Sequence, residues 1–390
     1  MPDPNLGAYN IEDLRRFAQR RLPKGIFEFV DRGSEDEVVL RENHAAFERI
    51  KLIPRALVDV SQRSARTSLF GHDISLPLVV GPTGVAGLLW YQGEVQLARA
   101  AAAAAVPFTV STGSLTSLET IAAEAPGRLW FQLYMWPERA KSHALVERAR
   151  QAGYEALVVT VDGVVSGNRE YNLRNGFTVP FSYSRRNLAD VMRHPRWLAG
   201  VLGRYLLNGG MPRYANMPPE FNRGVTAATP VSRSMARSES LTWDDLRDLR
   251  RRWPHALIVK GIMHAADALT ALDCGADGIV VSNHGGRNLD AAPASIEIVA
   301  PIAEAVAGRL TVLMDGGVRR GSDVIKALAL GADAVMIGRP ALYGVAAGGQ
   351  AGASRALAIL REEIGRVMAQ IGCKTVGEIT RECATALTRR

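Results

Sequence analysis

The sequence predicts an α/β protein built on a (β/α)8 TIM barrel, with an N-terminal helical extension and a long insertion after the fourth strand. Three observations predict this fold: eight short apolar runs, intervals long enough for a crossover helix, and a polar or glycine-rich corner after each run. Runs rich in Val and Ile are typical of parallel strands buried on both faces, and eight such units favour a closed barrel. The runs lie at 76–80, 107–110, 128–133, 156–161, 256–259, 278–281, 310–314 and 334–337.

A doubly wound open sheet is the alternative for alternating strands and helices. It is disfavoured because no GxGxxG motif follows the first apolar run. We therefore expect a single domain over residues 1–390, with the barrel at about 76–365. Before the barrel, Asn10 is placed to cap a helix that starts at Ile11 and ends before Pro23, and residues 52–66 are predicted to be irregular.

The composition is that of a globular protein and excludes several classes. The 390 residues are 47% apolar and 22% charged, enough for a large core without disulfides. The three cysteines form no CxxC pair and lie near no His-rich cluster, so neither a metal site nor a disulfide framework is expected. Residues 1–10 lack the pattern of a signal peptide, and no apolar stretch is long enough to predict a membrane-spanning helix.

The formal net charge of +8 leaves several partners open. An excess of Lys and Arg suits nucleic acid, an anionic membrane surface or anionic substrates, and it is also compatible with an ordinary solvated surface. No motif of a nucleic-acid-binding module occurs, so we expect no nucleic-acid partner.

The interval between the fourth and fifth runs is several times longer than the others, and its excess lies at about 177–240. Long insertions in compact domains are usually functional or mobile. Residues 185–213 contain six arginines, and the apolar run 197–207 between them is interrupted by Arg204. Such a segment is too short to span a bilayer and suits the plane of a membrane interface. A lid or an oligomer contact that packs the same residues is the alternative.

Polar side chains follow all eight runs, and in a barrel these corners meet at one mouth. The last two corners, at 315–319 and 338–339, combine glycines with Arg319 and Arg339. Glycines let backbone N–H groups approach an anion, a following helix N-terminus adds positive potential, and Arg binds phosphate in a bidentate way. These two corners therefore predict a site for a phosphorylated ligand, which could be a substrate, FMN or another nucleotide.

Four motifs carry a specific resemblance to a known family. They are SNHGGRNLD at 282–290, FQLY at 131–134, VKG at 259–261 and DGGVRRG at 315–321. In this order and on these corners they resemble the FMN-dependent enzymes that oxidise 2-hydroxy acids to 2-oxo acids. The resemblance extends from about Asn10 to Cys373 and implies a TIM barrel that binds FMN.

The resemblance also implies roles for individual residues. His284 matches the active-site base, and a histidine suits this task because its unperturbed pKa lies near neutrality. Asp162 matches the carboxylate that orients that histidine, although its position also suits a simple helix cap. The remaining matches are Arg287 for the substrate carboxylate, Arg169 for charge in the transition state, Tyr134 for a hydrogen bond to the substrate, and Lys260 for the electron-rich edge of the flavin.

Further residues match cofactor-binding positions of the family. Those expected to contact the flavin ring or ribityl chain, besides Lys260, are Pro82, Thr83, Gly84, Ser111, Gln132, Thr160 and Ser282. Those expected at the phosphate corners are Asp315, Gly316, Gly317, Arg319, Gly338 and Arg339.

Two departures from the family pattern and one glycine affect what we expect of substrate binding. Many members have tyrosine where this chain has Phe29, and the loss of that hydroxyl should weaken substrate binding by about 1 kcal/mol. After Asn168-Arg169-Glu170 the chain also departs from the common pattern, which affects loop pairing near Arg169. Gly84 leaves space beside the flavin, which favours an aromatic or otherwise bulky acid such as (S)-mandelate, with neutral drift as the alternative.

The long insertion also bears on which electron acceptor the resemblance implies. Membrane-associated members carry an insertion here and pass electrons to a quinone, which implies a peripheral enzyme on the cytoplasmic face of the inner membrane. The first alternative is a soluble oxidase that reduces O2 to H2O2 with lactate or glycolate-like substrates. A non-catalytic flavin-binding scaffold and another phosphate-site barrel enzyme are further alternatives. Because family members are often tetramers, we expect a homo-oligomer.

Overall fold

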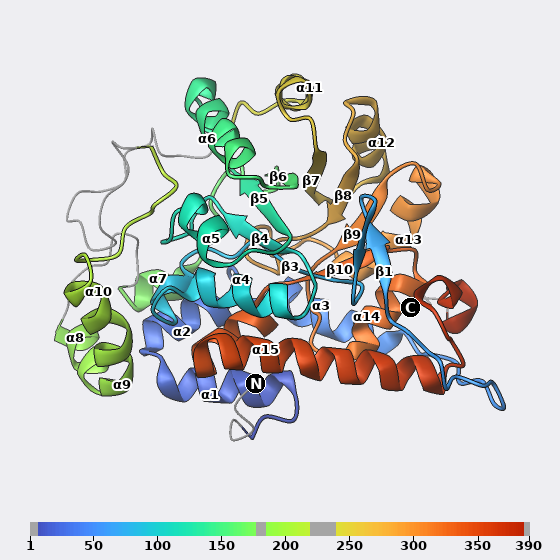
Figure 1. The fold of residues 1–390 in the computed structure, drawn as a ribbon, viewed down its shortest axis with the longest axis horizontal. Coiled ribbons are helices and arrows are strands. Elements are labelled where there is room, and N and C mark those ends of the chain that lie inside the picture. The colour runs from blue at the N-terminus through green and yellow to red at the C-terminus, as the bar shows by residue number, and fades with distance from the viewer. Residues whose placement is uncertain (1–6, 177–184, 219–238, 386–390) are drawn as a thin grey trace.

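The computed structural model describes residues 7–176, 185–218 and 239–385. Its centre is a closed barrel of eight parallel strands in the order β10-β3-β4-β5-β6-β7-β8-β9 (Figure 1). Each strand matches one of the eight apolar runs, so the predicted barrel is confirmed. The strands are β3 (Leu78–Val80), β4 (Phe108–Ser111), β5 (Leu129–Leu133), β6 (Ala156–Thr160), β7 (Ala256–Ile262), β8 (Gly278–Val281), β9 (Thr311–Met314) and β10 (Ala334–Ile337).

Helices surround the barrel on the outside. The longest is α15 (Arg339–Gln370), which bends at Gly348 and Gly349, where the backbone leaves helical geometry. It runs beside α1 (Ile11–Arg21) along one side of the molecule (Figure 1). The other helices around the strands are α4 (Gly93–Ala103), α5 (Leu118–Glu124), α6 (Arg139–Gln151), α11 (Trp243–Arg252), α12 (Ala265–Asp273), α13 (Ser295–Val306) and α14 (Gly321–Ala329).

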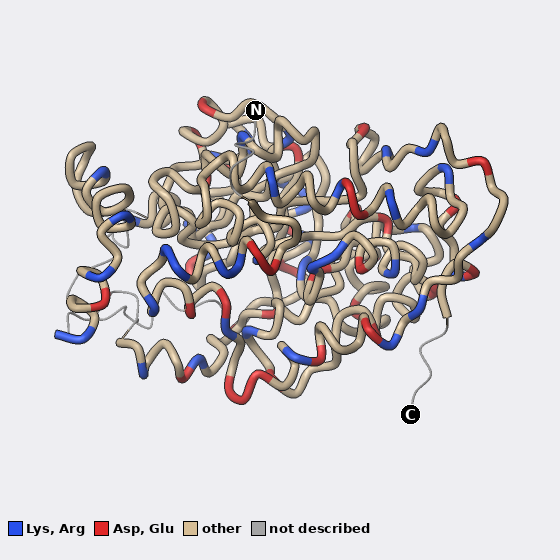
Figure 2. Tube along the Cα trace, turned by 90° about the horizontal axis from the view of Figure 1, so that it is seen from below, with Lys and Arg blue, Asp and Glu red and all other residues tan. Residues whose placement is uncertain are grey.

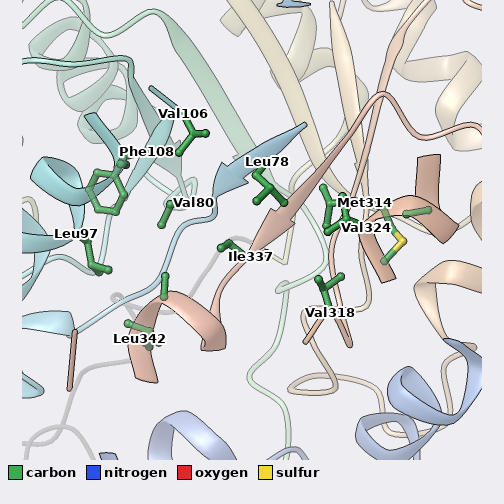
Figure 3. Packing of buried hydrophobic residues seen from close by; sticks show 14 of the residues in the cluster. Leu78, Val80, Leu97, Val106, Phe108, Met314, Val318, Val324, Ile337 and Leu342 are labelled. Atoms are coloured by element: carbon green, nitrogen blue, oxygen red, sulfur yellow. The ribbon is translucent and has the colours of Figure 1, made fainter. Parts of the chain in front are cut away.

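The alternation of side chains along the strands divides the core into two parts. Leu78 and Val80 of β3 point outward and pack with residues of the helices, as Figure 3 shows for the region around β3 and β10. Val79 lies between them and points into the barrel, where it joins Trp130, Met336 and other inward side chains. Because the interior is filled in this way, a ligand can enter only at the mouth.

The N-terminal extension consists of α1 (Ile11–Arg21), α2 (Lys24–Asp31) and α3 (Val38–Arg49). Asn10 caps α1 as predicted, since its Oδ1 accepts a hydrogen bond of 2.8 Å from the Asp13 N–H. A hairpin of β1 (Thr67–Leu69) and β2 (His72–Ile74) follows and was not predicted from the sequence. Its turn residue Phe70 packs edge-on against Trp130, with ring centroids 5.6 Å apart, beneath the amino ends of the strands.

Residues 185–207 of the insertion form a small helical lobe beside the barrel, at the left of Figure 1. Figure 2 shows mostly Lys and Arg among its charged residues. Trp197 and Val201 are buried, and the Trp197 indole N–H donates a 2.7 Å hydrogen bond to the Leu88 carbonyl. Trp197, in the run predicted to lie at a membrane interface, therefore fastens the lobe to the barrel and does not face outward. The elements of the lobe are α8 (Arg185–Met192), α9 (Pro195–Trp197), η3 (Leu198–Gly203) and α10 (Arg204–Leu207), and α7 (Glu170–Arg174) precedes the insertion.

Candidate active site

A cavity of about 390 Å³ opens at the carboxyl ends of the barrel strands. Five of the six residues predicted for catalysis line it, and Asp162 lies directly behind His284. Of the predicted cofactor residues, only Gln132 and Ser282 are not in the lining. Gln132 accepts a 3.1 Å hydrogen bond from Ser111, and Ser282 accepts one from Lys260. The others that line the cavity are Pro82, Thr83, Gly84, Ser111, Thr160, Asp315, Gly316, Gly317, Arg319, Gly338 and Arg339.

His284 is held between a carboxylate and a phenol. Its Nδ1 lies 2.9 Å from Asp162 Oδ1, and its Nε2 lies 3.4 Å from the Tyr134 hydroxyl. A carboxylate beside Nδ1 favours the tautomer that carries its proton there, which leaves the Nε2 lone pair on the side of Tyr134. His284 also has a left-handed backbone with φ of 58°, which is uncommon outside glycine and is found at functional sites.

The backbone around Asp162 explains how this carboxylate reaches the histidine. Gly261 in β7 has φ of 108°, and a Cβ there would lie 2.6 Å from the Asp162 Cβ. Only glycine allows β6 and β7 to approach so closely at this point. The Asn288 side chain donates a 2.7 Å hydrogen bond to the Asp162 carbonyl and so joins the corners after β6 and β8.

Lys260 provides a buried positive charge at the floor of the cavity. Its Nζ lies 2.8 Å from Asp315 Oδ2 and donates a 2.7 Å hydrogen bond to Ser282 Oγ. Burial alone would lower the pKa of Lys260, but the carboxylates of Asp315 and Asp162 outweigh it and raise the pKa. The ammonium group therefore stays charged at neutral pH.

Arg287 and Arg169 form a second cationic group. Arg287 donates hydrogen bonds of 2.7 Å to the Phe29 carbonyl and 3.1 Å to the Arg32 carbonyl, and its guanidinium lies 5.2 Å from the centroid of the Phe29 ring. Burial, followed by the charge of Arg169, lowers the pKa of Arg287 to about 10. Both residues remain cationic at neutral pH and line the cavity, so they suit an anionic group such as a carboxylate.

The predicted anion site lies at the corners after β9 and β10, where two glycines have left-handed backbones. Gly316 and Gly317 have φ of 99° and 83°, and a Cβ on Gly317 would lie 2.0 Å from the Asn43 carbonyl oxygen. Arg319 and the first residues of α15 line the cavity beside them. Arg339 was expected to bind a phosphate. Its guanidinium instead donates to the carbonyls of Val30, Arg32 and Gly285 and so joins the N-terminal extension to the barrel.

His44 of α3 lies close to this anion site, where the sequence indicated no functional residue. Burial, followed by the charges of Arg319 and Arg339, lowers the pKa of His44 to about 4. In the unfolded chain a histidine titrates near pH 6.5. The native state therefore binds fewer protons than the unfolded state between these values. The stability contributed by neutral His44 is complete above about pH 6.5 and is lost as the pH falls toward 4.

This difference predicts an acid sensitivity of the cofactor-free protein. Between pH 7.5 and 5.0 it should lose about 2 kcal/mol more unfolding free energy than a His44→Gln variant. Urea denaturation of both proteins at both pH values measures this difference. A variant that loses as much stability as the parent would show that His44 is protonated in the native state.

Trp136, Tyr214 and Met217 also line the cavity and were missed by sequence reasoning. Trp136 follows β5 two residues after Tyr134, so its place on a strand corner was an available signal. Tyr214 and Met217 lie in the insertion, far from any strand end, and no sequence pattern indicated their position.

A barrel with a phosphate corner, a buried lysine, and a histidine–carboxylate pair beside two arginines defines a class of enzymes that bind a phosphorylated cofactor and an organic acid. The model of the FMN-dependent dehydrogenase family matches residues 18–386, and the chain belongs to this family. It is accordingly an FMN-dependent oxidoreductase that acts on 2-hydroxy acids.

Individual relatives differ in substrate and in the kind of enzyme. (S)-Mandelate dehydrogenase of Pseudomonas putida is 43% identical over 373 residues, which are 95% of this chain and 92% of that protein. L-Lactate oxidase of Nostoc sp. is 42% identical over 374 residues, covering 95% and 96%. A crystal structure of monotopic membrane (S)-mandelate dehydrogenase superposes with a TM-score of 0.90 at 41% identity, over 97% of this chain and 99% of that chain.

Polar atoms in and around the cavity fit the FMN that this family binds. Thr160 Oγ1, Asp315 Oδ1 and Gln132 Nε2 are buried and have no hydrogen-bond partner within the described part of the chain. Unpaired buried polar atoms are costly, so a polar ligand is needed to satisfy them. A flavin ring with N–H and C=O groups along one edge has the required donors and acceptors, and its phosphate suits the corners at Gly317 and Arg319.

Proposed function

We propose that this protein oxidises an (S)-2-hydroxy acid with an aromatic side chain, such as mandelate, to the 2-oxo acid, and does so as one unit over residues 1–390. One observation carries the proposal: His284 and Arg287 line the same cavity, and its wall includes Gly84 and Gly113, which lie against each other without side chains. The identity to a mandelate dehydrogenase supports the aromatic substrate. The similar identity to a lactate oxidase supports the alternative, a soluble oxidase for smaller acids.

In the proposed mechanism, Arg287 and Tyr134 bind the substrate carboxylate and hydroxyl and so place the α-carbon near His284. The Nε2 atom of His284 removes a proton, and the adjacent Asp162 carboxylate stabilises the imidazolium that results. Arg169 stabilises negative charge that develops on the substrate. Bound FMN supplies the two-electron acceptor. Lys260 offers its charge at the floor of the cavity, where it would stabilise an electron-rich ligand.

Replacing Asp162 with asparagine should lower kcat about 10- to 10⁴-fold, because the amide keeps the shape but removes the charge beside Nδ1. FMN content should stay at the parent level, since Asp162 lies behind His284 and not in the cavity lining. Steady-state rates and the flavin absorbance of the purified variant measure both quantities. A variant with parent kcat would exclude Asp162 from the reaction.

We also propose that the insertion lobe binds a membrane surface and that a membrane quinone accepts the electrons. The lobe exposes Leu206 and Leu207, with 56% and 86% of their surfaces accessible, together with Leu188 and Met192. Exposed arginines flank them at 185, 186, 193, 196 and 204. Exposed apolar side chains among basic ones suit an anionic bilayer surface. Among the described residues, no helix combines the length and the apolar character needed to cross a bilayer.

A Leu206→Glu/Leu207→Glu variant should bind anionic vesicles at least about tenfold more weakly, because burying a carboxylate among acyl chains is unfavourable. Co-sedimentation with vesicles that contain phosphatidylglycerol measures the affinity. Leu57→Glu is the matched control, since Leu57 is fully exposed and lies outside the lobe. Equal binding of all three proteins would place the membrane contact elsewhere. The cytoplasmic face of the inner membrane and a tetrameric assembly are inferred from the family resemblance.

The function itself is tested on the purified holoenzyme without oxygen. Addition of (S)-mandelate should bleach the flavin absorbance, and a quinone analogue should restore it faster than oxygen does. Fast recovery with oxygen alone would favour the oxidase. Bleaching by lactate but not by mandelate would keep the reaction and reject the aromatic substrate.

A further inference from the structure

Residues 214–217 of the insertion return to the barrel and contribute to the cavity. Tyr214 and Met217 line it together with residues of the strand corners. They lie beyond the helical lobe, which ends with α10 at Leu207. The insertion therefore has two separate parts, an exposed lobe and a short segment at the cavity.

Hydrogen bonds hold this short segment to the corner after β4. The Asn216 side chain accepts a 2.9 Å hydrogen bond from the Leu118 N–H and donates a 3.4 Å bond to the Ser111 carbonyl. The neighbouring Ala215 N–H donates a 3.2 Å bond to the Ser114 carbonyl. Asn216 is also buried, with 1% of its surface exposed. These contacts make residues 214–217 a fixed wall.

The position of this wall follows from the strand order. The anion site lies at the corners after β9 and β10, whereas Ser111 and Tyr134 follow β4 and β5 on the other side of β3. Next to the wall, Gly84 and Gly113 face each other without side chains, and a Cβ on Gly113 would lie 3.7 Å from the Gly84 Cα. Gly113 lies between Ser111 and Ser114, whose carbonyls accept hydrogen bonds from Asn216 and Ala215, so the wall lies beside this pair of glycines.

We propose that Tyr214 and Met217 contact the side chain of the 2-hydroxy acid and select an aryl group over a methyl group, and that Asn216 positions them. The proposal rests on the proposed function. When the carboxylate lies at Arg287 and the α-carbon at His284, the remaining substituent has to occupy a part of the cavity without charged groups. A tyrosine ring and a polarisable methionine sulfur both make favourable contacts with an aromatic ring.

The test compares Tyr214→Ala and Met217→Ala with the parent holoenzyme on (S)-mandelate and (S)-lactate. Each variant should lose about 10- to 200-fold in kcat/KM for mandelate, but less than about threefold for lactate, since a methyl group does not reach the wall. Tyr9→Ala is the matched control, because Tyr9 is 82% exposed and its hydrogen bond to Asp13 uses the backbone N–H.

A second readout does not depend on turnover. Titration of the holoenzyme with 2-oxo-2-phenylacetate, followed by the change in flavin absorbance, gives a dissociation constant. It should rise about tenfold or more in both wall variants and stay unchanged in Tyr9→Ala. Asn216→Ala should shift both readouts in the same direction, and Asn216→Asp should shift them less, because it keeps the acceptor for the Leu118 N–H.

The outcomes separate this inference from the function on which it rests. A loss of kcat/KM and of affinity confined to the aryl ligands supports selection by residues 214–217. Equal losses of kcat/KM for mandelate and lactate, or no loss for either, would contradict the proposed role of Tyr214 and Met217. They would leave 2-hydroxy-acid oxidation in place. A parent enzyme that prefers lactate would also contradict that role. A parent enzyme that oxidises neither acid rejects the proposed function, and the wall with it.

Discussion

Replacing His284 with asparagine should slow the reduction of the bound flavin by (S)-mandelate about 10²- to 10⁴-fold, the usual contribution of a general base. The amide can still form a hydrogen bond with Asp162, but it cannot take up a proton at neutral pH. Anaerobic stopped-flow absorbance measures the rate directly, and FMN content measures whether the site is intact.

His255→Asn is the matched control for this variant. His255 is exposed and follows α11 at the amino end of β7, away from the cavity. It should leave the rate of flavin reduction unchanged. Parent-like reduction in His284→Asn would rule out proton removal by this histidine and require another base.

Replacing Arg287 with methionine should lower kcat/KM for mandelate at least about 30-fold, because the substrate carboxylate would lose a buried ion pair worth about 2 kcal/mol or more. Arg287→Lys should fall between the parent and the methionine variant. Its ammonium keeps the charge, but it cannot bind a carboxylate in the planar, bidentate way of a guanidinium.

Arg287 also donates to the carbonyls of Phe29 and Arg32, so the methionine variant requires a control for structural damage. The amide of mandelic acid provides it, since it has no negative charge. The ratio of kcat/KM for acid and amide should fall toward one in the variant. If both substrates lose activity equally, the effect is on the fold of the N-terminal extension and not on the carboxylate.

The barrel was predictable because its signal is local. Each parallel strand is buried on both faces, so it appears as a continuous apolar run, and eight such runs separated by helix-length intervals favour closure. The hairpin of β1 and β2 was missed because strands of three residues carry too little periodicity. Its purpose is visible only in three dimensions, where Phe70 packs beneath Trp130.

That the candidate site residues lie close together was predictable for a topological reason. The carboxyl ends of all barrel strands meet at one mouth, so His284, Asp162 and Lys260 had to lie near one another although 122 positions separate the first two. The family motifs then assigned a role to each of them. Arg339 shows the limit of this reasoning, because its corner was located correctly while its three bonds to backbone carbonyls were not foreseen.

The amino-acid sequence is sufficient to predict the order of strands, the residues at their ends, and the family. The positions of segments that do not follow a barrel strand are visible only in the three-dimensional structure. It placed His44 of the N-terminal extension beside the anion site, turned Trp197 toward the barrel, and brought Tyr214 and Met217 into the cavity. The physical reason is that these positions depend on contacts between distant segments, such as Trp197 with Leu88 and Asn216 with Ser111, which no local periodicity records.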